Sequence, residues 1–96
     1  MPRVQNNAYN PGALPYTVPA SGDAAVFCPL GGGTVNAFAT PAAGDILAVY
    51  APSDGATEAY QVSWNGKNYQ GASGNTVLTA VAYAKLIARF SGTEWR

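Results

Sequence analysis

"YQVSWNGKNYQG", residues 60–71, is the stretch of this sequence that most directly predicts its fold. Its centre is Asn65-Gly66, and both residue types tolerate the positive φ angles of a type I′ turn, the tight turn that joins two antiparallel strands. Apolar and polar side chains alternate on each side of the turn, which is typical of a strand with one buried face. The stretch therefore predicts a β-hairpin with Gly66 in its turn.

A hairpin closed by this turn has a fixed register, with Trp64 opposite Lys67 and Val62 opposite Tyr69. Because side chains alternate with a period of two, Tyr60, Trp64 and Tyr69 then share one face. In a half-buried sheet the apolar face normally points inward, so we interpret this face as part of the core. The alternative is an exposed aromatic platform on which a sugar ring stacks.

Short apolar segments continue on both sides of the hairpin, separated by Gly, Pro, Ser and Asp. This spacing predicts an all-β fold, a small antiparallel β-sandwich or barrel. The expected strands are 24–29, 34–39, 46–51, 58–64, 67–71, 76–80, 85–90 and 93–96. Good helix formers leave a helix open over residues 76–90. The segments SGDAAVF and AGDILAV, at 21–27 and 43–49, echo each other, but two copies do not establish a repeat fold.

The C-terminal segment, residues 89–96, reads RFSGTEWR. A turn at Ser91-Gly92 pairs Ala88 with Trp95 and brings the indole ring beside Phe90. A large aromatic side chain gains little free energy in a fraying chain end. We therefore expect Trp95 and Phe90 to have a structural role, with Trp95 closing the core.

The N-terminal segment contains four of the seven prolines within residues 1–22. Proline fixes its own φ and biases the preceding residue toward extended conformations. We expect residues 1–16 to form an extended arm for attachment or contact between subunits, and residues 17–96 to form a single β-domain. A disordered leader is the alternative for residues 1–10. The candidate partner-binding residues of the arm are Arg3, Val4, Tyr9, Leu14 and Tyr16.

Charge is sparse in this sequence: 10% of the residues are charged, and five basic residues balance five acidic ones. Such a chain has no long-range field that could gather phosphates, so no nucleic acid partner is expected. No apolar run is long enough to cross a bilayer, and we expect no membrane partner. The N-terminal stretch lacks the apolar region of a secretory signal, which indicates synthesis in the cytoplasm of the producing cell.

Catalytic side chains are also scarce. The sequence has no histidine and a single cysteine, which removes the Ser-His-Asp and Cys-His arrangements. Cys28 is interpreted as a small buried apolar residue. Asp23, Asp45 and Asp54 each adjoin a glycine, which is typical of turns. We therefore expect no enzymatic activity, no cofactor and no metal site.

Residues 14–96 resemble the small β-domains of bacteriophage virion proteins, meaning head decoration or cement proteins, head-fibre proteins and modules of tail fibres. The resemblance is carried by an SGD turn before an apolar strand, by TVNAFATPAAGD followed by ILAV, and by the NGK turn. It ends with TVLTAVAYAKLIARFSGTEWR, an apolar strand followed by a Gly-Thr turn and a tryptophan.

The resemblance implies a structural protein of the virion, made in the host cytoplasm, that decorates or cements the capsid surface. It implies a symmetric homo-oligomer, a trimer, whose N-terminal arm binds the major capsid protein or another virion protein. The alternative function is a carbohydrate-binding or tail-fibre receptor-binding module that uses Tyr60, Trp64 and Tyr69.

Overall fold

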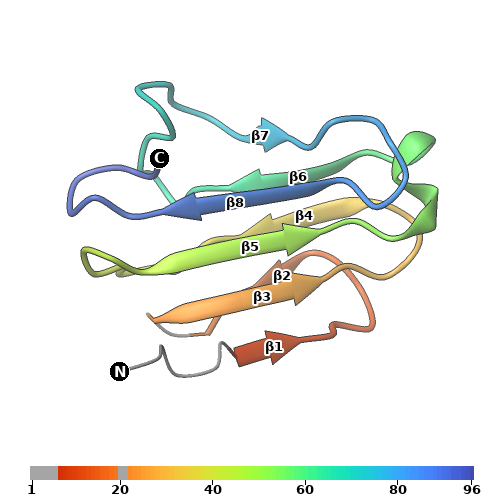
Figure 1. Ribbon diagram of the computed structural model, residues 1–96, viewed down its shortest axis with the longest axis horizontal. Helices are drawn as coiled ribbons and strands as arrows, with labels where there is room; N and C mark the ends of the chain where they lie inside the picture. Colours follow the sequence, from red (N-terminus) through yellow and green to blue (C-terminus); the bar gives the residue numbers. More distant parts are fainter. Residues whose placement is uncertain (1–6, 20–21) are drawn as a thin grey trace.

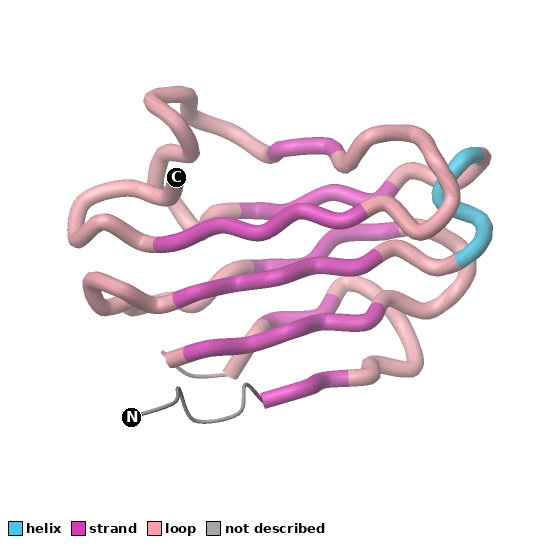
Figure 2. The backbone as a smooth tube through the Cα atoms, viewed as in Figure 1, coloured by secondary structure: helices cyan, strands magenta, loops and turns pink. Residues whose placement is uncertain are grey.

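The protein is described here by a computed structural model that covers residues 7–19 and 22–96. Two four-stranded sheets lie one in front of the other (Figures 1 and 2). The first sheet has the order β1 (Asn7–Tyr9), β3 (Asp23–Phe27), β5 (Ile46–Tyr50), β8 (Lys85–Arg89). The second sheet has the order β2 (Tyr16–Thr17), β4 (Gly33–Asn36), β6 (Tyr60–Ser63), β7 (Thr76–Val77). A short 3-10 helix, η1 (Ser53–Ala56), follows β5.

Strand direction is the main difference from the expected antiparallel fold. From β1 to β6 the chain passes from one sheet to the other after each strand. It therefore returns to each sheet in the same direction, and both β1-β3-β5 and β2-β4-β6 are parallel. The pairs β5-β8 and β6-β7 are antiparallel. The prediction of wholly antiparallel pairing was wrong, and the protein is a strand-rich domain with two mixed sheets.

The Asn65-Gly66 turn forms, but the hairpin predicted around it does not. Both residues have positive φ, 54° and 83°, and the Lys67 N–H donates to the Trp64 carbonyl oxygen at 3.1 Å. Beyond the turn, Tyr69 bridges to Ala72 and to the C-terminal segment instead of to β6. The antiparallel neighbour of β6 is β7. The turn chemistry was therefore predictable, whereas the expected hairpin register and the strand at 67–71 were wrong.

The core lies between the two sheets. In β5, Leu47 and Val49 point inward and are buried, and Val35 and Val62 face them from the second sheet. The largest fully buried side chains are Trp64, Trp95, Phe38 and Leu47. Burying a side chain of this size contributes about 1.5–3 kcal/mol, so these residues dominate the stability of a domain this small.

The C-terminal segment doubles back on β8 in a register two residues away from the expected one. Phe90, instead of Ala88, pairs with Trp95, and Arg89 and Arg96 exchange two backbone hydrogen bonds of 2.9 Å. A shift of two residues leaves each side chain on the same face. Trp95 is therefore fully buried, as the expected register also required. Strands, not a helix, form at β7 and β8, as predicted.

The described part of the N-terminal segment is built into the domain. β1 pairs with β3, and β2 pairs with β4. Tyr9, Leu14 and Tyr16 pack against the core. This packing removes more of their apolar surface from water than an arm that stood apart from the domain would, and is therefore favourable. Residues 7–16, part of the expected extended arm, therefore pair and pack within their own chain. Residues 1–6, which include Arg3 and Val4, lie outside the described residues.

Candidate functional site

The aromatic face expected at residues 60–71 turns inward. Tyr60 is 2% exposed and Trp64 is 1% exposed. Tyr69 is half-buried, and its ring stacks on Trp64 with a centroid distance of 4.7 Å and an angle of 12°. The interpretation of this face as core is confirmed, and the three rings do not form an exposed platform.

Tyr60 and Asp54 hold η1 against the loop before β4. The Tyr60 hydroxyl donates a hydrogen bond to the Asp54 carboxylate, and the Gly31 N–H donates to the second carboxylate oxygen at 2.9 Å. These two hydrogen bonds hold the pKa of Asp54 below its usual value, and the bond from Tyr60 has the larger effect on that pKa. Burial, followed by the bond to Asp54, raises the pKa of Tyr60. Every one of these contacts lies within the fold, which indicates a structural role.

Trp64 and Trp95 lie in a buried cluster of aromatic rings. The Trp64 indole N–H donates to the Thr76 hydroxyl at 2.9 Å and so ties β6 to β7. The Trp95 ring lies 5.3 Å from the ring of Phe90 and 5.9 Å from that of Phe38. Among the described residues, the Trp95 indole nitrogen has no hydrogen-bond partner. The cluster therefore packs the end of the chain into the core.

The described residues of the predicted arm site also contact their own chain. The rings of Tyr9 and Tyr16 lie 6.0 Å apart at 43°. The side chain of Leu14 packs against Gly33, where an added Cβ would meet it. All three arm side chains are only partly exposed. These residues therefore join this part of the chain to the domain.

The side chains of β3, β5 and β8 that point away from the core form a surface that the sequence interpretation missed. We call it the outer face. The strand register arranges it in three rows that cross the sheet. The middle row is Ala25, Ala48 and Ile87; the second is Phe27, Tyr50 and Lys85; the third is Asp23, Ile46 and Arg89. Two of these rows are mainly apolar, although they face away from the core.

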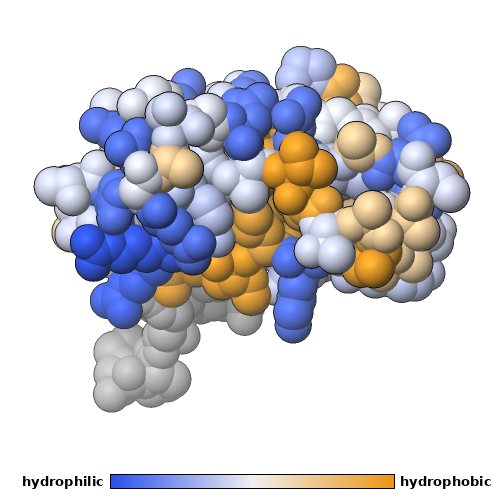
Figure 3. Space-filling view, turned by 90° about the horizontal axis from the view of Figure 1, so that it is seen from above, coloured by the Kyte–Doolittle hydropathy of each residue, from blue (hydrophilic) through white to orange (hydrophobic). Residues whose placement is uncertain are grey.

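Of the six large apolar side chains that are exposed in the described part of the chain, three lie on or beside the outer face, and the others, Leu30, Val77 and Val81, lie in β7 or in loops. Phe27 is 44% exposed, Ile87 53% and Tyr83 71%. Figure 3 looks from above onto the edge of the two sheets, where apolar side chains also form a band between hydrophilic groups. Contiguous apolar surface on a small protein marks an interaction site far more often than scattered apolar residues do. The outer face is therefore the candidate functional surface.

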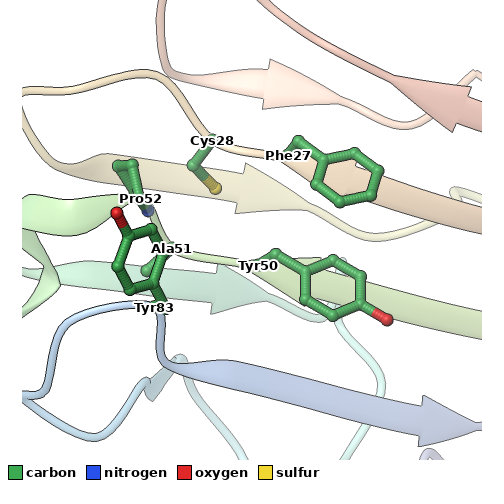
Figure 4. Close-up of a pocket in the computed structure, with 6 residues that line it drawn as sticks. All are labelled: Phe27, Cys28, Tyr50, Ala51, Pro52 and Tyr83. Atoms are coloured by element: carbon green, nitrogen blue, oxygen red, sulfur yellow. The ribbon is translucent and has the colours of Figure 1, made fainter.

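A shallow hollow of about 320 Å³ lies at one end of the outer face. Figure 4 shows the rings of Phe27 and Tyr50 side by side and the ring of Tyr83 beside Pro52. The two stacked rings are 4.9 Å apart at 11°. Tyr83 has a φ of 57°, which is rare for a bulky residue, and its N–H donates to the Pro52 carbonyl oxygen at 3.1 Å. That bond holds an exposed ring at the rim of the hollow.

One sequence signal could have revealed this surface. The strand ILAVY, β5, is apolar at every position instead of alternating. A strand that is apolar on both faces is typical of a sheet that is covered on both sides. In this chain the second side is the outer face, where Phe27 and Ile87 remain exposed.

Comparisons with known proteins add no family to this picture. No protein-family model matches the sequence, and no curated protein matches it.

No helix among the described residues has the length and apolar character needed to span a membrane. In the same residues, no three histidine, cysteine or acidic side chains come together in a group that could hold a metal ion.

Proposed function

We propose that this chain is a structural protein of a bacteriophage particle that decorates or cements the capsid surface. It acts as a symmetric oligomer, a trimer, and has no enzymatic activity. Its N-terminal arm, including Arg3 and Val4, binds the major capsid protein or another virion protein. In this proposal the two sheets form a β-sandwich, and the protein is located on the virion.

The observation that carries the proposal is the apolar outer face of the first sheet. A chain of 96 residues with 10% charged residues has few charged groups with which to solvate such a surface. Packing against another protein removes the exposed rings and aliphatic groups from water, which is a favourable and largely salt-independent contribution. A subunit of a larger particle fits this surface better than a protein that acts alone in solution.

The described core packing is consistent with a rigid building block. The inward side chains of the hairpin stretch, which could have supplied a ligand platform, are used to fill the core. The contacts left for partners are the outer face and the N-terminal segment that enters the first sheet at β1. Two separate contact regions are what a subunit needs if it is to bind both its own copies and a capsid.

The proposal is tested on particles purified from a lysate of a phage that encodes the chain. We expect the chain in the particles at a copy number that matches symmetric positions on the capsid, measured by quantitative mass spectrometry. Deletion of residues 2–6 should leave the circular dichroism spectrum unchanged and remove the chain from the particles. Val77→Asp, on the exposed strand β7, is the control that should remain incorporated. Absence of the unaltered chain from the particles would refute the proposal.

A further inference from the structure

We propose that the outer face of the first sheet is the contact between copies of this chain, and that neighbouring copies are related by an axis parallel to its strands. This inference rests on the symmetric oligomer of the proposed function and specifies its interface. It commits to a second copy as the occupant of the outer face.

The shape of the middle row is complementary to itself. At one end Ile87 stands out and is 53% exposed, whereas at the centre Ala48 is 4% exposed because larger side chains surround it. At the other end Ala25 has only a methyl group. A rotation about an axis parallel to β5 keeps each residue at its height along the strand. It therefore brings β8 of one copy against β3 of the next, with Ile87 over Ala25.

The charges agree with this arrangement. Asp23 and Arg89 lie at the same position along the strand direction. The rotation therefore places Arg89 of one copy opposite Asp23 of the next. A carboxylate has about four acceptor sites, so Asp23 can receive this arginine in addition to contacts in its own chain. At the opposite end of the strands, Lys85 comes over the ring of Phe27, an arrangement favoured by cation–π attraction. Each end of the interface thus joins a cation to a group that attracts it.

Other ways of pairing the same surface bring like charges together. A twofold axis perpendicular to the strands would set Lys85 against Arg89 of the second copy. Antiparallel pairing of two β8 edge strands centred on Ile87 would do the same. Like charges placed directly opposite each other are destabilising, so the basic residues on β8 select the axis parallel to the strands.

The outer face itself spans three strands of five residues, roughly 10 by 17 Å, so a specific contact also includes the segments around it. The molecule measures 35 × 31 × 19 Å, and Figure 1 looks along its shortest axis onto the first sheet. A face with these longer dimensions covers roughly 1,000 Å², against about 800 Å² buried per partner in a standard interface. The broad face of the molecule, instead of an edge, is therefore the natural place for self-association.

The test is a cross-link between copies in the double variant Ala25→Cys/Ile87→Cys. Within one chain these positions are separated by β5, two strand spacings or about 9–10 Å, which is too far for a disulfide. Mild oxidation of the purified full chain should therefore yield covalent species of more than one chain on a non-reducing gel. The unaltered chain, whose Cys28 is buried, should yield none, and Ala25→Cys/Val77→Cys should yield far less at the same protein concentration.

The pattern of products separates the two proposals. Covalent trimers support both the interface and the trimer; covalent dimers alone support the interface and overturn the trimer. If light scattering gives an oligomeric mass and no cross-link forms, the interface is elsewhere and this inference is wrong, while the proposed virion role stands. A monomeric mass at all concentrations overturns both the interface and the proposed oligomer, and particle incorporation then tests the virion role separately.

A second pair of variants covers the case in which the cysteines disturb the fold. Ile87→Asp should lower the oligomeric mass to that of a single chain with an unchanged circular dichroism spectrum, because Ile87 is exposed and contributes little to the core. Val77→Asp, the matched exposed position in the second sheet, should keep the oligomeric mass. An oligomer that survives Ile87→Asp contradicts the inference.

Discussion

The rings of Trp64 and Trp95 lie 5.5 Å apart at an angle of 37° in the core of the protein. Trp64 follows β6 directly, and Trp95 is the residue before the C-terminal Arg96. Their contact joins a strand of the second sheet to a segment that pairs with β8 of the first. Because it bridges the two sheets, we expect mutation of either ring to be strongly destabilising.

Trp95→Ala should therefore destabilise the protein by about 3–5 kcal/mol, the usual cost of removing a large buried ring. That loss is a large fraction of the stability of a small domain, so the variant should be largely unfolded at 37 °C. The measurement is denaturant unfolding followed by circular dichroism. Tyr83→Ala, at a position that is 71% exposed, is the matched control and should change the midpoint little.

Trp64→Ala should also unfold the protein, because Trp64 is 1% exposed and donates to Thr76. The same variant tests the carbohydrate-binding alternative on a glycan array. A well-folded Trp64→Ala protein that lost binding to a glycan recognised by the unaltered chain would contradict the core role assigned to this ring.

Gly55→Ala should be destabilising although it adds only a methyl group. The new Cβ would clash with the carbonyl oxygen of Val81 and would lie 3.2 Å from the Cβ of Ala51. Overpacking of this kind costs about 1–3 kcal/mol. Gly12→Ala is the control, because nothing lies within 4 Å of its added Cβ. Equal stability of the two variants, measured by thermal unfolding, would show that η1 can move aside.

Asp54 should make the stability depend on acidity. Its folded-state pKa is lowered by the bonds from Tyr60 and Gly31, so its contribution is fully present above the unfolded-state pKa, about 3.9. The contribution is lost as the pH falls through the lower folded-state pKa. Between pH 5 and pH 2 the free energy of unfolding should therefore fall less for Asp54→Asn than for the unaltered protein. The measurement is urea unfolding of both proteins at a series of pH values and about 25 °C. Parallel curves for the two proteins would contradict this role.

Cys28 should react slowly with iodoacetamide in the folded protein. Burial raises the pKa of its thiol to about 11, so the reactive thiolate is scarce near pH 8. Labelling followed by mass spectrometry should accelerate strongly in denaturant, whereas a Val77→Cys variant should label quickly at its exposed position in both conditions. Rapid native labelling of Cys28 would indicate that the end of β3 opens readily.

Local features of the fold were predictable because they depend on nearby residues. The Asn65-Gly66 turn, the strands near β3, β4, β5, β6 and β8, and the inward face of Tyr60 and Trp64 follow from turn chemistry and from the alternation of side chains. The burial of Trp95 followed as well, since a register error of two residues preserves the face.

Strand partners and direction were not predictable in the same way. SGDAAVF and AGDILAV, the echoing segments, become β3 and β5, which lie side by side and parallel. An alternating strand carries the same pattern whether its neighbour is parallel or antiparallel, so this pairing depends on how the whole chain crosses between the sheets. The outer face was missed for a related reason, since three strands distant in sequence build it.

The Asn65-Gly66 turn, most of the extended segments and the burial of Trp64 and Trp95 could be predicted from the amino-acid sequence, because these properties depend on a residue and its near neighbours. The row formed by Ala25, Ala48 and Ile87 and the stacking of Phe27 on Tyr50 became visible only in the folded chain. Those contacts depend on strand order and register, which arise from the packing of all the segments at once.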